Sequence, residues 1–305
     1  MSILPTAWEL SSLLCKLLLY FGAASIAGGS LCIWQFSEGS RRSIKSNLAY
    51  ILFGAVLGFQ AVLLNFFIQL GLINDNGIAG MFDWGLAPFL MGTQVGELTF
   101  YRLAGFVIVL ISSLLFLRTI NQLNRPPGLL FYRLLTSTHL LALLLLATSF
   151  RIGGHISVLT WSAQAAISLH FLAFSLWIGS LYPLLKLTKD SDLLSLKYIL
   201  KRFGDMAVGV LLILLAGGVT MLLQLLASPG ELITTAYGLS IVAKLLLVLT
   251  LLLVAATNKF FLVPRLVEGG SVARLRNSIR LEMVLATFIL VITSYLSTLI
   301  GPPGH

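Results

Sequence analysis

The stretch YGLSIVAKLLLVLTLLLVAATN, residues 237–258, decides the fold class of this 305-residue chain. Its one charged side chain is Lys244, and the rest is largely apolar. A run of about 20 apolar residues is long enough to cross the ~30 Å hydrocarbon core of a bilayer as a helix. Similar runs recur along the chain, which predicts an all-α, polytopic membrane protein with eight transmembrane helices, near residues 8–36, 47–72, 98–118, 129–151, 160–185, 204–227, 237–262 and 278–299.

The composition excludes a soluble domain and a β-barrel. The chain is 58% hydrophobic and 10% charged, with a mean hydropathy of +0.98, far from the average of soluble proteins. The apolar runs lack the two-residue alternation of barrel strands. The first seven residues carry no basic side chain and the following run is too long for a signal peptide, so we expect the first segment to be retained.

The sequence predicts one integral membrane domain over residues 1–305, because no Pro- or Ser-rich linker interrupts it. The longest hydrophilic loop is expected at 186–203. The pattern T-x-Y-x-L occurs in TFYRL (99–103) and TAYGL (235–239), at the start of two predicted helices. This suggests two parallel halves, 1–151 and 152–305, of four helices each.

The net charge of +9 reflects topology. Most of the 20 Lys and Arg residues fall in alternate loops, near residues 41–45, 118–133, 186–202 and 259–280. Basic loops stay in the cytoplasm, so both termini are predicted to lie outside. Because this distribution accounts for the charge, we predict no nucleic-acid partner and expect membrane lipid to surround the chain.

All four histidines are predicted at the bilayer midplane or on the outer side. His139 and His170 lie about ten residues, or ~15 Å, inside their helices, His155 is on the short outer loop between them, and His305 ends the outer tail. The buried rings either hydrogen-bond across helices or bind a metal. Imidazole with thioether or thiol partners favours copper, although zinc, nickel and haem iron also accept imidazole.

Other polar side chains gather in the outer half of the membrane. Because exposing them to lipid is costly, we expect them to face one another or a funnel that opens to the outside. Asn258 and Glu282 are predicted near the cytoplasmic end, as an exit or as a structural hydrogen-bonded pair. The candidate residues of the path, or of structural polar contacts, are Glu97, Arg102, Met221, Gln224, Lys244, Asn258 and Glu282.

No catalytic signature is present: the chain has no nucleophile elbow, zinc-protease motif, P-loop or C-x-x-C, so we do not expect an enzyme. A b-haem held by His139 and His170 is the main alternative, because two histidines at equal depth on neighbouring helices suit bis-histidine ligation. Such a protein would carry electrons across the membrane.

Several stretches resemble the bacterial copper resistance protein D (CopD) family. They are LHFLAFSLWIGSL (169–181) with His170, RFGDMAVGVLLILLAGG (202–218), the stretch from Tyr237 through Lys244 to Asn258, and LRNSIRLEMVLA (275–286) with Glu282. GGH (153–155) resembles the glycine–histidine pair of that family. The resemblance extends over about 129–303. The chain departs from the family pattern at Ile167, where an acidic residue is common.

The resemblance implies copper homeostasis and resistance at the bacterial cytoplasmic (inner) membrane, with copper, as Cu(I) or Cu(II), moving from periplasm to cytoplasm. A periplasmic copper-binding protein of the CopC type is the partner it implies. We expect capture near His155, aided by His305 or Met91, and transfer to a site containing His170 and His139. A non-transporting membrane partner of a periplasmic copper carrier is the other alternative.

Overall fold

The computed structural model describes residues 5–37, 39–74, 76–153, 159–226, 228 and 230–300. In these residues, eight long helices form the bundle, and six short helical elements lie between or after them. The long helices are α1 (Ala7–Phe36), α2 (Arg41–Asn74), α4 (Gln94–Gln122), α5 (Leu129–Ile152), α6 (Trp161–Asp190), α7 (Leu193–Leu225), α9 (Ala236–Thr257) and α10 (Val272–Tyr295). The short ones are η1 (Gly77–Phe82), α3 (Ala87–Met91), α8 (Glu231–Thr234), η3 (Asn258–Leu262), η4 (Pro264–Glu268) and η5 (Leu296–Ile300).

Eight helices in the described residues are long and apolar enough to cross a membrane, which confirms the predicted fold class. Their ends differ from the prediction on the basic side. The expected loop at 186–203 is wrong, because α6 continues to Asp190 and α7 begins at Leu193. Hydropathy marks the part of a helix that suits lipid, and it does not mark where backbone hydrogen bonding stops.

Asp192 explains why α7 begins so early. Its Oδ1 accepts hydrogen bonds from the backbone N–H of Leu194 and of Ser195, both at 3.0 Å, so it caps the helix. The bond from Ser195 is the main reason that the pKa of Asp192 lies below its usual value. The cap starts a helix of 33 residues, of which the first turns extend beyond the apolar run.

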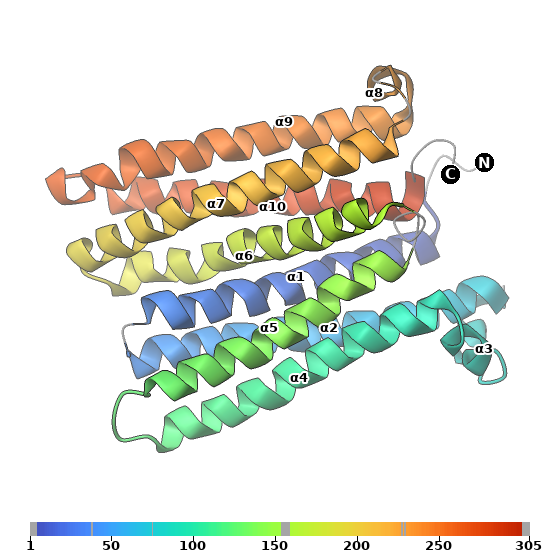
Figure 1. The fold of residues 1–305 in the computed structure, drawn as a ribbon, viewed down its shortest axis with the longest axis horizontal. Coiled ribbons are helices and arrows are strands. Elements are labelled where there is room, and N and C mark those ends of the chain that lie inside the picture. The colour runs from blue at the N-terminus through green and yellow to red at the C-terminus, as the bar shows by residue number, and fades with distance from the viewer. Residues whose placement is uncertain are drawn as a thin grey trace.

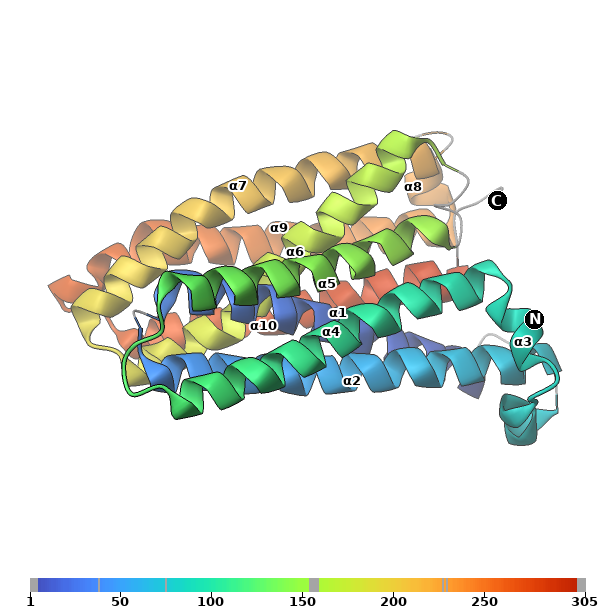
Figure 2. The ribbon, with the colours of Figure 1, turned by 60° about the horizontal axis from the view of Figure 1, so that its bottom comes forward.

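Helix α1 lies at the centre of the bundle, between α2 on one side and α6 on the other (Figure 1). It also contacts α5 and α10. Figure 2, turned by 60°, shows α4 and α5 on the same side of α1, with α7 and α9 on the far side of α6. Thus α1 joins two groups of helices, one made of α2, α4 and α5 and the other of α6, α7, α9 and α10.

The contact between α1 and α6 depends on two glycines. A Cβ atom on Gly28 would lie 1.9 Å from the carbonyl carbon of Gly179, and one on Gly179 would lie 1.7 Å from the carbonyl oxygen of Ala24. Backbones therefore meet without side chains between them, as at small-residue crossings in membrane proteins. Gly179 belongs to the stretch 169–181 that resembles the family, and its close contact with α1 is a packing reason for a glycine at this position.

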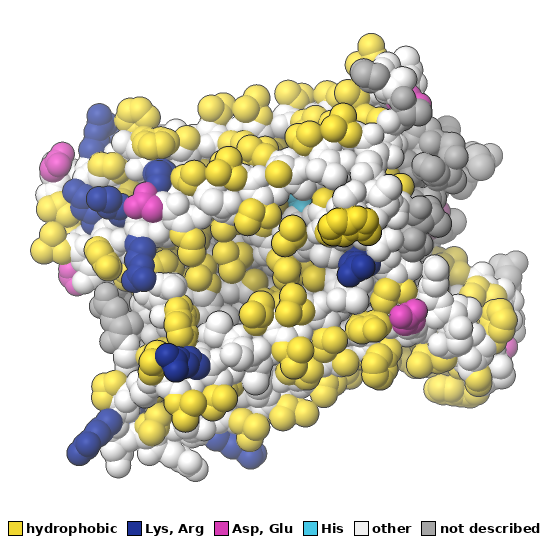
Figure 3. Space-filling view, viewed as in Figure 1, with side chains coloured by type: hydrophobic (Ala, Val, Ile, Leu, Met, Phe, Trp, Pro, Cys, Tyr) yellow, Lys and Arg dark blue, Asp and Glu magenta, His cyan; other side chains and the backbone are white. Residues whose placement is uncertain are grey.

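Charge and apolar surface separate along the bundle (Figure 3). Lys and Arg side chains gather at the end where α1 meets α2, α4 meets α5, α6 meets α7 and α9 leads into α10, and hydrophobic side chains cover the middle. Helix α1 begins and η5 ends at the opposite end. Which end faces the cytoplasm stays a prediction from the charge pattern.

Helix α9 is the least covered long helix. It packs mainly on α10, and α7 meets its extension through η3 and η4. In the most apolar 18-residue stretch of the span Ala236–Glu268, 11% is buried inside the bundle, against 56% for the corresponding stretch of α1. Helix α7 therefore meets the segment that follows α9 at the basic end of the bundle.

Candidate functional site: two histidines and a buried acid–amide pair

His139 lies in a closed contact between three helices. Its ring has no exposed surface. Nδ1 is hydrogen-bonded to the Ser30 hydroxyl of α1 at 2.7 Å, and Nε2 to the Ser113 hydroxyl of α4 at 3.2 Å. Phe116 packs edge-on against the ring. Both nitrogens are occupied by the protein, so neither is available to a metal in this conformation.

His170 lies in a different contact, between α6 and α7. Its Nδ1 donates to the backbone carbonyl of Leu214 at 3.0 Å. Gly217 and Gly218 of α7 leave room for the ring, because a Cβ on Gly217 would lie 3.1 Å from the Cβ of His170. No contact recorded among the described residues joins this ring to His139. These contacts therefore hold the two rings in separate places, whereas the sequence predicted a single site that contains both.

The bond to Leu214 fixes the form of the His170 ring. A carbonyl oxygen only accepts, so Nδ1 carries the hydrogen and Nε2 of the neutral ring carries a lone pair. Within the described chain, Nε2 has no hydrogen-bond partner. Metal-binding histidines commonly donate their other ring nitrogen to a backbone carbonyl in this way. His170, which is partly exposed, thus has the arrangement of a ligand.

The separate contacts also bear on haem. Bis-histidine ligation needs two rings that present a free nitrogen to the same iron, but both nitrogens of His139 are bonded to serines. The arrangement of the described residues does not favour the electron-carrier alternative.

Three further predicted path residues lie on α7 and α9. Lys244 of α9 is close enough to act electrostatically on the ring. Met221 follows Gly217 by one turn, which places it on the same face of α7. Gln224, one turn further, accepts a hydrogen bond from the Thr160 hydroxyl at 2.9 Å. These three predicted path residues therefore lie along one stretch of α7 and the facing part of α9.

Arg102 and Lys16 hold helices together at the end that is predicted to face outwards. Arg102 Nε donates to the Ser149 hydroxyl of α5 at 2.9 Å, and its guanidinium lies 5.2 Å from the centre of the Phe150 ring. Lys16 Nζ donates to the Ser297 carbonyl at 3.1 Å, to its hydroxyl at 2.9 Å and to the Thr298 hydroxyl at 3.2 Å. The two groups are also connected, because Tyr20 stacks on the Phe150 ring that Arg102 contacts, and Lys16 and Arg102 interact electrostatically.

Asn258 and Glu282 form the buried pair that the sequence suggested. The Asn258 amide donates to Glu282 Oε1, and the side chains are 8% and 4% exposed. They line a cavity of about 160 Å³ between α6, α7, α9 and α10, near the basic end. At its rim Lys259 forms an ion pair with Asp205 of α7 at 2.6 Å.

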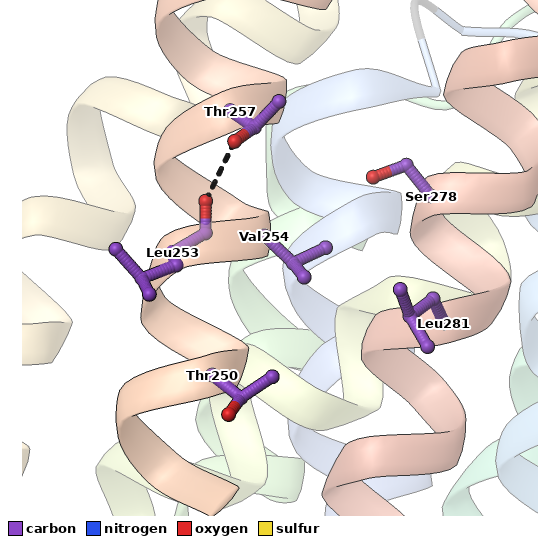
Figure 4. A pocket seen from close by; sticks show the side chains of 6 residues that line it. All are labelled: Thr250, Leu253, Val254, Thr257, Ser278 and Leu281. Carbon is purple, nitrogen blue, oxygen red and sulfur yellow. Dashed lines mark hydrogen bonds between the residues drawn. The ribbon is translucent and has the colours of Figure 1, made fainter.

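A larger groove of about 330 Å³ lies at the surface between α9 and α10 (Figure 4). Its polar atoms are hydroxyls, and the Thr257 hydroxyl donates to the carbonyl of Leu253 in its own helix at 2.8 Å. The remaining lining residues are Thr250, Val254, Ser278 and Leu281. Without imidazole, sulfur or carboxylate, this groove lacks the ligands that copper prefers.

The remaining predicted residues lie elsewhere. Met91 is half exposed on α3, and Glu97 is exposed in the first turn of α4. His155 and His305 lie outside the described residues. Within the described part of the chain, no three His, Cys, Asp or Glu side chains come together in a group suited to a metal ion.

Sequence reasoning missed the partners of the histidines. Ser30 and Ser113 are small polar residues inside apolar runs, and nothing in their spacing connects them to His139. The Leu214 carbonyl carries no sequence signal of its own. Gly217 is a close-packing position, because a Cβ atom there would lie 3.1 Å from the Cβ of His170.

Residues 197–296 match the family model described as copper resistance protein D. The matched segment contains most of α7 and all of α8, α9, η3, η4 and α10, and so includes the Asn258–Glu282 pair. It begins after His170. No curated protein and no solved structure gave a significant match. The chain thus has eight helices suited to crossing a membrane, and its segment 197–296 is similar to the copper resistance protein D family.

Proposed function

We propose that this protein moves copper ions across the bacterial inner membrane, from the periplasm to the cytoplasm, without catalysing a chemical reaction. The family match supports a role in copper resistance. The observation that carries the transport proposal is the free Nε2 of His170, which is held ready by the bond from Nδ1 to Leu214 at 3.0 Å.

Copper is the cargo, and His170 is its proposed ligand in the membrane. Met221, on the same face of α7 as Gly217, supplies a thioether, and imidazole with thioether suits Cu(I). The route that we propose runs between α7 and α9 from these residues to the cavity at the basic end. This route passes through the segment that matches the family.

Lys244 makes the proposed site suitable for release. Its charge acts on His170, and a copper cation at Nε2 is repelled by it in a medium of low dielectric constant. A passage needs sites that bind weakly enough for the ion to leave. A histidine beside a lysine therefore fits transport better than storage.

The donor that we propose is a periplasmic copper-binding protein of the CopC type. The charge pattern predicts that the end of the bundle without basic loops faces the periplasm. His170 and Met221 lie in the half of the bundle nearer that end. Copper delivered there has the shorter distance to travel to His170.

Copper binding to purified protein tests the site. We expect His170→Ala to lose about one equivalent of bound copper, measured separately for Cu(I) and Cu(II). Ser168→Ala is the matched control on the same helix, since its hydroxyl bonds only to carbonyls of Gln164 and Ala147, and it should bind as the wild type does. Wild-type stoichiometry and affinity in His170→Ala would remove the site.

Uptake into proteoliposomes separates a transporter from a membrane partner that only docks a copper carrier. We expect copper to accumulate inside wild-type vesicles and uptake to fall at least tenfold with His170→Ala. Copper that binds the protein but never reaches the vesicle lumen would support the docking role.

A further inference from the structure

The cavity at the basic end contains a buried oxygen atom without a partner. Asn258 Oδ1 is shielded from solvent and has no hydrogen-bond partner, although the amide nitrogen of the same side chain donates to Glu282. A buried acceptor left unsatisfied costs about 1–3 kcal/mol. The cavity holds few other polar groups, since apolar side chains make up most of its lining.

A local change in the helix directs Asn258 to this position. At Asn258, α9 gives way to the π-turn η3, in which the backbone N–H of Val263 donates to the Asn258 carbonyl at 2.9 Å. π-turns inside longer helices often occur at functional sites. The wider turn places the Asn258 carboxamide against Glu282 of α10, which lies 24 positions further along the chain.

The charges around the cavity leave Glu282 without a cationic partner. Among the described lining residues, α6 and α7 contribute no titratable side chain, and the one charged side chain besides Glu282 is Lys259. Lys259 is paired with Asp205, which also interacts with Lys201 on the exposed side of α7. Burying an isolated carboxylate costs far more than neutralising it by proton uptake.

We propose that Glu282 holds a proton and shares it with Asn258 in a two-bond acid–amide pair. The amide N–H donates to Oε1, and the acid O–H on Oε2 donates to Asn258 Oδ1. One added proton thus neutralises the carboxylate and satisfies the orphaned acceptor. The proton comes from water in the cavity and returns to water when the carboxylate forms again.

A buried, protonatable carboxyl of this kind is how many transporters carry protons through the membrane. The chain has no nucleotide-binding motif, so a copper flux needs an ion gradient if it is to run uphill. In this respect the proposal rests on the proposed function: a proton at Glu282 is available to exchange against copper. The protonated pair itself stands without it.

Infrared spectroscopy of the purified protein without copper tests the pair. At neutral pH we expect the C=O stretch of a protonated carboxylic acid, and we expect Glu282→Gln to abolish it. Gln offers the same donor and acceptor as the protonated acid, so this variant should fold. Glu97→Gln, which removes an exposed carboxylate, is the matched control and should keep the band.

Two further measurements make the assignment specific. Asn258→Leu should shift the band to higher frequency, because the acid loses its hydrogen-bond partner. This measurement tests the pair even if Glu282→Gln fails to fold. In D2O the band should shift as the proton exchanges through the cavity. Absence of the band in the wild type, or its persistence in Glu282→Gln, would overturn the proposal. Copper uptake is measured separately, so either result can fail alone.

Discussion

His139 and His170 show how the same side chain at a similar depth takes two roles. Their positions inside apolar runs were enough to predict that both rings lie within the membrane-spanning helices. Their partners were not predictable, because a hydroxyl on α1 or α4 faces His139 only through the way the helices pack. The structure separates a fully bonded ring from one with a free nitrogen.

Replacing His139 by Ala should weaken the fold and leave copper binding intact. The change removes two buried hydrogen bonds and leaves a void against Phe116, for which we expect a loss of about 2–4 kcal/mol in the free energy of unfolding. Thermal unfolding in detergent measures this loss. Bound copper per folded molecule should equal that of the wild type, and a loss of one full equivalent would show that His139 is a ligand.

At the scale of single elements, hydropathy located all eight spans but not their ends. The early start of α7 depends on one capping carboxylate, Asp192, in a segment with five basic residues nearby that looked like a loop. The π-turn at Asn258 was also beyond prediction, because no residue type marks where a helix widens by one residue. Both features come from local hydrogen bonds that composition does not report.

The cap at Asp192 should make α7 sensitive to acid. Because its folded pKa lies below the ordinary value of 3.8, the ionised carboxylate adds stability above about pH 4, and this contribution is lost as the pH falls through the lowered value. Asp192→Asn keeps an acceptor without the charge. We expect the melting temperature of the wild type to exceed that of the variant at pH 6, and the difference to shrink towards pH 3.

A constant difference between the two proteins over this pH range would show that the charge of Asp192 does not support the cap. Asp192→Ala, which removes the acceptor as well, should melt below both proteins at pH 6.

At the scale of the whole molecule, the crossing of α1 and α6 joins its two groups of helices. We expect Gly179→Ala to destabilise the protein by about 3 kcal/mol, because the new Cβ would lie 1.7 Å from the Ala24 carbonyl oxygen. The yield of folded protein and its melting temperature report the effect. Gly209→Ala on α7, where no atom lies within 4 Å of the added Cβ, is the control and should be neutral or slightly stabilising.

Equal stability of Gly179→Ala and Gly209→Ala would mean that the α1–α6 contact yields easily. The glycine would then have no structural role in holding the two groups together.

The orientation in the membrane can be read from cysteine labelling in intact cells. Asn76→Cys lies at the end predicted to be periplasmic and should react with a membrane-impermeant maleimide. Asn124→Cys lies between α4 and α5, at the predicted cytoplasmic end, and should react only after lysis. The native Cys15 and Cys32 are buried and should stay unlabelled. The reverse pattern would invert the topology.

The candidate site illustrates what a sequence can and cannot specify. His170 was named from residue type and depth, whereas Asn258 and Glu282 were named from their resemblance to the copper resistance protein D family, with a hydrogen-bonded pair as one predicted role. The gathering of outer polar groups round a single funnel stays a prediction: Arg102 and Lys16 each bond to a neighbouring helix, and they also interact electrostatically with each other. Depth follows from position along the chain, whereas lateral neighbours depend on packing angles.

The sparse packing around α9 has a consequence for the contact between the protein and the lipids of its bilayer. With 11% of its most apolar window buried, this helix is solvated largely by annular lipid, and acyl chains complete the wall of the molecule beside α10. Stripping that lipid with harsh detergent should loosen α9 first, and its amides should exchange with deuterium sooner than those of α1. The fluidity of the host membrane is therefore part of the working structure.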